Sequence, residues 1–103
     1  MDFFTIKKIY FLYKAQEHRD IYHNDIDKTY NANIVKRNYI LLASIQDDED
    51  EKAITLANLA QFQIERKRRI TAAPIISLAI FYAKNENLVE KLSEIENDLH
   101  KSL

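Results

Sequence analysis

Apolar residues recur at helical spacing along most of the chain, and short clusters of Asn and Asp separate the apolar segments. The first segment, 2–23, has an apolar face made of Ile6, Ile9, Tyr10 and Tyr13. Phe4 and Phe11 lie roughly opposite that face on a helix. Residues 3–13 also have high strand propensity, so a β-strand is the alternative there. A second helix is expected over 28–46.

A capping signal marks the start of a third helix. Asp48 followed by Glu51 has the spacing of a capping box, which predicts a helix from there to about Arg69. The inner stripe of this helix is expected to comprise Ala53, Leu56, Ala57, Ala60 and Ile64. Small residues in such a stripe allow a neighbouring helix to approach closely.

The rest of the chain predicts two more helices. Thr71 is expected to cap a fourth helix with Pro74 in its first turn, where the missing N–H costs nothing. Because this helix is apolar around most of its circumference, we expect it to be central and buried, and Leu78→Ala to cost about 2–5 kcal/mol. After a break at Asn85 or Asn87, a narrow seam like that of a coiled coil follows, made of Leu88, Leu92, Ile95 and Leu99.

Composition strengthens the helical interpretation. The 103 residues include no glycine and a single proline. Without glycine, the chain lacks phosphate-binding glycine loops, dinucleotide fingerprints and nucleophile elbows, which all need backbone free of a Cβ near the ligand. Tight β-hairpins are also disfavoured, and Asn and Asp are left to form the turns. We therefore predict an all-α fold, a compact bundle of four or five helices in one domain over 1–103.

Charge and apolar content bear on location. The formal net charge of −1 gives no overall bias toward nucleic acid or anionic membranes. The most apolar stretch, 74–83, is about half of the ~20 residues that a membrane span needs. The N-terminus opens with an acid where a secretory signal carries basic charge. We expect a cytoplasmic protein that does not bind membranes.

Catalytic and metal chemistry has few candidates. The chain has no cysteine, three dispersed His and no Ser with a neighbouring base at a readable spacing. His18 and His23 raise a metal hypothesis, but five residues on a helix turn the two imidazoles about 140° apart. We expect both to lie in a solvated C-terminal turn. No enzyme activity, metal or cofactor is predicted.

The aromatic residues of the first segment are the best functional lead. They cover more than one helical face, so a single internal contact is not expected to bury them all. The predicted partner-binding surface sets two aromatic anchors in a basic rim and comprises Phe4, Lys7, Lys8, Phe11 and Lys14. These residues predict a small non-enzymatic interaction or regulatory protein of a bacterium or phage, of the inhibitor, immunity or adaptor type. Its partner is expected to be another protein or, in a homodimer, a second copy.

A basic cluster supports an alternative function, the binding of nucleic acid by a regulator. The residues of that surface would be Lys36, Arg37, Arg66, Lys67, Arg68 and Arg69. Two other interpretations compete with it. Basic residues in the last turn of a helix complement the helix dipole without any ligand. An acidic row on the last helix, Glu90, Glu94 and Asp98, is also placed to face the cluster within the bundle.

Overall fold

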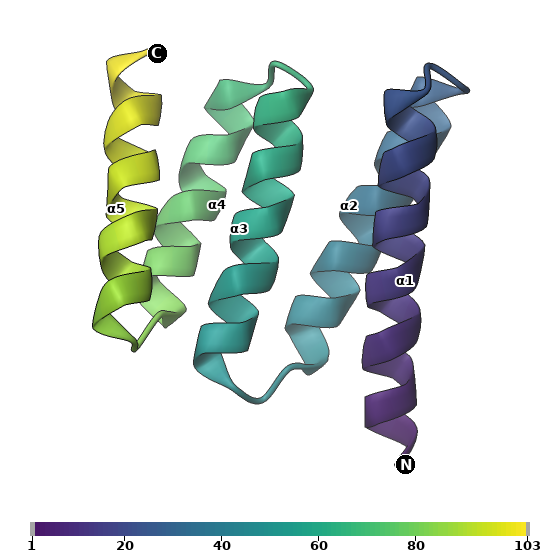
Figure 1. Cartoon of the computed structure of the whole chain (residues 1–103), viewed down its shortest axis with the longest axis horizontal. Coiled ribbons are helices and arrows are strands. Elements are labelled where there is room, and N and C mark those ends of the chain that lie inside the picture. Colours follow the sequence, from purple (N-terminus) through teal and green to yellow (C-terminus); the bar gives the residue numbers. More distant parts are fainter. Residues whose placement is uncertain (1, 103) are drawn as a thin grey trace. The chain divides into compact units, whose positions relative to one another are not determined.

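The computed structural model describes residues 2–102, which form five α-helices and no strand. The helices are α1 (Phe3–His23), α2 (Lys28–Ile45), α3 (Glu49–Glu65), α4 (Arg69–Tyr82) and α5 (Glu86–Lys101) (Figure 1). The predicted all-α class with four or five helices is confirmed. The contacts between helices form two units, one ending at Ile45 and the other beginning at Gln46. The single domain expected from the sequence stays a prediction, and each unit is described by itself.

The first helix begins directly after Asp2, which caps it. Asp2 Oδ1 accepts a hydrogen bond from the Thr5 N–H at 2.8 Å, and this bond lowers the pKa of the Asp2 carboxyl. From there α1 continues without interruption to His23. The strand alternative over 3–13 is therefore wrong. A helix that is capped at its start and packed on a partner helix overrides the local strand propensity of aromatic and β-branched residues.

In the first unit, α1 and α2 form an antiparallel hairpin (Figure 1). The turn between them holds Asp25 and Asp27 at φ values of 62° and 43°. These aspartates take the left-handed conformation that glycine usually adopts, as expected for a chain without glycine. Between the helices, Ala15, Ala32 and Val35 are fully buried, and the two alanines let the backbones approach closely.

In the second unit, α4 packs on both α3 and α5. The predicted cap of α3 is confirmed, because Asp48 Oδ1 accepts the Glu51 N–H at 2.9 Å. The predicted inner stripe is partly correct: Ala53, Leu56 and Ala60 are buried, whereas Ala57 and Ile64 are half-buried. Phe62, which the stripe did not include, is 0% exposed. It is one of the largest fully buried side chains in the part of the chain that is described.

The fifth helix also begins where an Asn break was expected. Asn85 Oδ1 accepts the N–H groups of Asn87 and Leu88 at 2.9 and 3.2 Å, so Asn85 is the N-cap. The leucine seam faces inward: Leu92 and Leu99 are buried, and Leu88 and Ile95 are half-buried. Since α5 packs on α4, this seam has a partner helix within the chain.

The third helix ends at Glu65, earlier than predicted. Lys67 adopts φ 62°. Around it, the Arg68 N–H donates to the Gln63 carbonyl at 2.8 Å, and the Lys67 N–H donates to the Ile64 carbonyl at 2.9 Å. This pair of bonds is a Schellman motif, whose left-handed residue is usually glycine. In this chain a lysine occupies that position, and no sequence signal marked it.

The start of α4 differs from the prediction for the same reason. With the chain reversed at Lys67, α4 begins at Arg69 and Thr71 lies inside it. Thr71 is therefore not the cap; its hydroxyl donates to the Arg68 carbonyl at 2.8 Å. Pro74 lies in the helix interior and not in the first turn. Its missing N–H leaves the Ile70 carbonyl without the usual helical partner.

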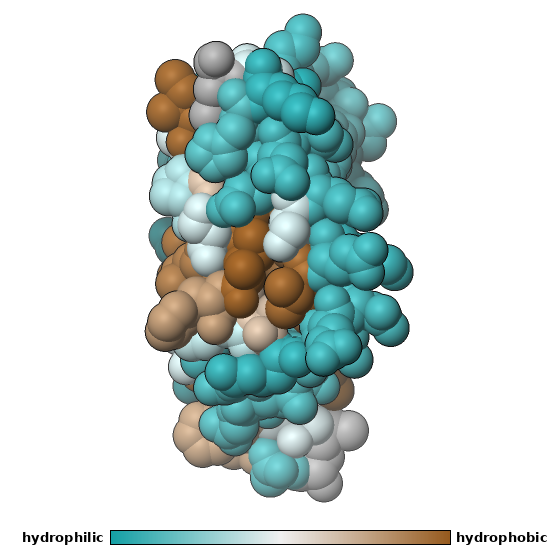
Figure 2. All heavy atoms as spheres, turned by 90° about the vertical axis from the view of Figure 1, so that its left-hand side faces the viewer, coloured by the Kyte–Doolittle hydropathy of each residue, from teal (hydrophilic) through white to brown (hydrophobic). Residues whose placement is uncertain are grey.

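The fourth helix is central in its unit but not buried all round. Its buried residues are Ala72, Ile76 and Ala79, whereas Ile70 and Phe81 are 79% and 74% exposed. Leu78 is 44% exposed, so the loss of stability of about 2–5 kcal/mol predicted for Leu78→Ala is wrong. The buried position on this helix is occupied by Ile76. Figure 2, seen from the side of α5, shows apolar atoms at the surface beside a broad hydrophilic area.

Asp50 ties the start of α3 to the turn after α4. Its Oδ1 accepts the backbone N–H groups of Lys84 and Asn85 at 2.6 and 3.0 Å. Glu49 adds an ion pair to Lys84 Nζ at 3.3 Å. The two backbone donors favour the charged carboxylate and lower the pKa of Asp50.

Asp50→Asn is expected to lower the urea midpoint of unfolding at neutral pH. The pKa of the Asp50 carboxyl is lower in the folded than in the unfolded protein, where it is near 3.8. The stability that the charged carboxylate contributes is therefore fully present above pH 3.8, and it is lost as the pH falls through the pKa of the folded state. The difference in midpoint between wild type and variant therefore shrinks in acid. Urea titrations followed by circular dichroism measure it, with Asp47→Asn at an exposed neighbouring acid as the control. The same pH dependence in both variants would contradict the role of Asp50.

Candidate functional site

The first helix turns a row of large apolar side chains away from α2. Ala15 is the only buried residue of Phe3–His23, all of which the structure describes. On the opposite side of the helix, five side chains are between 53% and 65% exposed. This surface, the outer face of α1, comprises Phe3, Ile6, Ile9, Tyr10 and Tyr13. At the edge of this surface, the Lys7 ammonium lies 4.5 Å from the centre of the Phe3 ring.

The predicted partner-binding residues lie on another side of α1. Phe4 and Lys7 are exposed, whereas Lys8, Phe11 and Lys14 are half-buried. Phe11 and Lys14 line a groove against α2. The sequence offers two apolar faces on this helix, and packing selects the one that contains Ala15, because a small residue lets α2 approach. The more exposed of the two faces is therefore the one that contains Ile6 and Tyr13, and not the one that contains Phe11.

The groove between α1 and α2 has a volume of about 370 Å³. It belongs wholly to the first unit. Helix α1 contributes Tyr10, Phe11, Lys14 and His18, and α2 contributes Tyr30, Ile34, Arg37, Asn38 and Leu41. Rings and aliphatic side chains thus line the groove together with polar and basic groups, and its exposed lining is more polar than apolar. Volumes of this order are typical of ligand-binding clefts.

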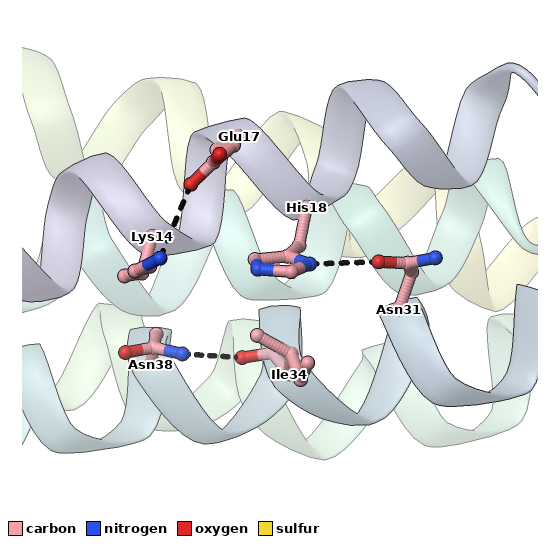
Figure 3. A network of polar contacts seen from close by, with 6 residues as sticks. All are labelled: Lys14, Glu17, His18, Asn31, Ile34 and Asn38. Carbon is pink, nitrogen blue, oxygen red and sulfur yellow. Dashed lines mark hydrogen bonds and ion pairs between the residues drawn. The ribbon is translucent and has the colours of Figure 1, made fainter. Parts of the chain in front are cut away.

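A buried asparagine fixes the orientation of His18 at one end of the groove (Figure 3). The Asn31 Nδ2 donates to the carbonyls of Ile26 and Asp27 at 2.8 and 3.1 Å, which leaves its Oδ1 as an acceptor. His18 Nδ1 lies 2.7 Å from this oxygen and so carries the proton of the bond. The other ring nitrogen points away from Asn31, toward the side where Lys14 and Asn38 lie.

Asn38 presents a second buried amide. The residue is 7% exposed, and its Nδ2 donates to the Ile34 carbonyl at 2.8 Å. Its Oδ1 accepts no hydrogen bond from the residues that the structure describes. In Figure 3 this oxygen points away from Ile34. Solvent reaches this oxygen in the groove, so the groove offers an acceptor that a ligand can use.

The charges lining the groove are positive. The Lys14 ammonium lies 3.5 Å from Glu17 and 5.9 Å from the centre of the Tyr10 ring. Arg37 is exposed and forms no ion pair with any residue within 2–102. No carboxylate is among the residues that line the groove. The groove therefore combines basic groups with aromatic walls.

The basic cluster 66–69 extends from the C-cap of α3, Arg66, to the first residue of α4, Arg69, and does not lie in the last turn of α3 as expected. Arg66 and Lys67 still lie directly at the end of α3, so the interpretation through the helix dipole stays a prediction. Lys67, Arg68 and Arg69 are exposed, and Arg69 donates to the Ser102 hydroxyl at 3.1 Å. Across the described residues 2–102, no ion pair joins the cluster to the acidic row Glu90, Glu94 and Asp98. Lys36 and Arg37 lie on α2, in the other unit.

His18 and His23 do not converge. Both lie on the regular helix α1, as their spacing required, and His18 faces α2 while His23 is exposed in the last turn. The solvated turn expected for both is thus correct for His23 and wrong for His18. Within residues 2–102, no group of three or more His, Asp or Glu side chains is placed to hold a metal ion.

Comparison with protein families, with curated proteins and with solved structures finds no match to this chain. None of the helices within residues 2–102 combines the length and apolar character needed to cross a lipid bilayer. The side chains of the α1–α2 hairpin are therefore the basis for a functional proposal.

Sequence reasoning missed the polar residues of the groove, above all Asn31 and Asn38. A signal for them exists. Asn31, Val35, Asn38 and Leu42 follow one another at 4-3-4 spacing and are all buried. Asparagines in the inner stripe of a helix need partners, and their presence there marks a polar network.

Proposed function

We propose that this is a small non-enzymatic interaction protein whose outer face of α1 pairs with a second copy of the chain. One observation carries the proposal: five large apolar side chains, three of them aromatic, are more than half exposed on one side of a helix. Contiguous apolar patches of this kind mark interaction surfaces in soluble proteins. Aromatic residues are also the commonest anchors of interfaces.

The spacing of the outer face suits a helix partner. Phe3, Ile6, Tyr10 and Tyr13 follow at 3-4-3 spacing, which forms a seam along one helix. An antiparallel copy of α1 centred at the level of Lys8 places Phe3 opposite Tyr13 and Ile6 opposite Tyr10. A two-fold axis makes each of these contacts twice.

Such pairing is compatible with a regulatory role of the inhibitor, immunity or adaptor type. A protein of this class acts by occluding a partner's surface or by holding two partners together. Its mechanism needs exposed side chains and no catalytic group. The nucleic-acid alternative has narrower support, a single exposed turn of basic residues in a chain with a formal net charge of −1. That alternative and the cytoplasmic location stay predictions.

Ile6→Glu tests the proposed pairing. We expect wild type to sediment as a dimer at micromolar concentration and Ile6→Glu to raise the dissociation constant by about tenfold or more, since it buries an unpaired charge in the seam. Sedimentation velocity measures the change, and circular dichroism checks that helicity is kept. The matched control is Ile54→Glu, at an isoleucine of α3 with 49% exposure. A monomeric wild type, or equal dissociation by both variants, would overturn the proposal.

A further inference from the structure

We propose that the groove between α1 and α2 binds a short acidic peptide segment of a partner protein. The inference rests on the proposed role as an interaction protein, because the occupant is a protein segment. It uses a different surface, since only Tyr10 belongs both to the groove and to the outer face of α1. The two proposals can therefore fail separately.

The charge of the groove selects an acidic occupant. Arg37 offers a planar guanidinium that no carboxylate within 2–102 engages. Lys14 lies on the facing helix, and its contact with Glu17 is a 3.5 Å pair between partly exposed side chains, which an incoming carboxylate can replace. Because no acid lines the groove, a negative side chain meets attraction from both walls.

The acceptor on the wall of the groove favours a ligand that also donates a hydrogen bond. Asn38 Oδ1 is held in place by the bond from Asn38 Nδ2 to the Ile34 carbonyl and has no donor of its own. His18 Nε2 is turned to the same side because Nδ1 is bonded to Asn31. An ionised carboxylate alone has no proton to give these atoms. A peptide supplies backbone N–H groups next to its acidic side chains.

The length of the groove favours a peptide over a compact molecule. On α2 the lining residues extend from Tyr30 to Leu41, which at 1.5 Å per residue is about 16 Å along the helix. An extended peptide of about five residues covers that distance. The ring of Tyr30 at the end of the groove near His18 and the ring of Phe11 toward its other end offer apolar contacts beside the basic groups. The expected ligand is thus a carboxylate side chain beside an aromatic or aliphatic one.

Selection from a random-peptide display library on the immobilised full chain tests the inference. We expect the enriched peptides to carry Asp or Glu next to an apolar residue. For a labelled peptide from that selection, fluorescence polarisation should show that Arg37→Glu weakens binding by about tenfold or more. Asn38→Leu, which keeps the branched shape of the side chain and removes the acceptor, should weaken it several-fold. Arg68→Glu makes the same charge change outside the groove and should leave binding unchanged.

Three results would overturn the inference. The first is enrichment of peptides without acidic residues. The second is an equal loss of affinity in Arg37→Glu and Arg68→Glu, which would show only general attraction to a basic surface. The third is full displacement of the peptide by 4-hydroxyphenylacetate at the peptide's own concentration, which would show a small-molecule site. If wild type binds the peptide but sediments as a monomer, pairing through α1 fails and the groove assignment stands.

Discussion

Phe62→Ala is expected to lower the free energy of unfolding by about 3–5 kcal/mol. Phe62 is 0% exposed near the end of α3, within the unit where α3 packs on α4. Removing the ring loses its transfer free energy and leaves a cavity that the surrounding helices close only in part. Arg66, whose guanidinium carbon lies 5.7 Å from the centre of the ring, also loses that contact.

Phe81→Ala is the matched control for this loss. Phe81 is 74% exposed on α4 of the same unit, so its truncation should change stability by no more than about 0.5 kcal/mol. Urea unfolding followed by circular dichroism measures both variants. A loss in Phe62→Ala as small as in Phe81→Ala would show that the interior of this unit is not packed around Phe62.

Asn31→Ala is expected to destabilise the hairpin by about 1–3 kcal/mol. Asn31 is 3% exposed, and its side chain connects α2 to the His18 ring and to the carbonyls of Ile26 and Asp27. Alanine removes both the donor and the acceptor. The His18 Nδ1–H and the Ile26 carbonyl then lose this partner, whereas the Asp27 carbonyl keeps the backbone N–H of residue 31. Such a loss in a half-buried setting is more costly than the loss of a bond exposed to water.

Asn33→Ala on the same helix provides the comparison, because Asn33 is exposed. The stability difference comes from urea titration, and NMR of the imidazole reports on His18 directly. In wild type the Nδ1 proton should be protected from exchange, and in Asn31→Ala it should exchange with water. Retained protection in the variant, or an equal destabilisation by Asn33→Ala, would contradict the network.

Local signals in the sequence predicted the helices well. Asp2, Asp48 and Asn85 each cap a helix, because a short polar side chain satisfies backbone N–H groups within two or three residues. The lack of glycine predicted turns built by Asp, and Asp25 and Asp27 indeed take left-handed conformations. Where local signals were silent, the prediction was wrong: Lys67 reverses the chain at a position that sequence normally marks with glycine.

The sequence did not predict which apolar face of a helix packs against its neighbour. Residues of α1 show apolar character on more than one side, and periodicity alone does not choose between the side of Phe11 and the side of Ile6. Residues of α4 are likewise apolar nearly all round, yet Ile76 is buried and Leu78 is not. In both helices the buried side carries alanines, since close approach of two helices depends on small residues at the contact.

By itself, then, the sequence determined the all-α class, the helix starts other than that of α4, and the left-handed Asp turn, because capping and turn conformation depend on neighbours a few residues away. Only the tertiary structure decided that the outer face of α1 is exposed and that Lys14, Arg37 and Asn38 line one groove. These outcomes depend on which of several apolar faces packs against a helix distant in sequence. That choice is made by the summed burial and shape of both helices, and no single residue encodes it.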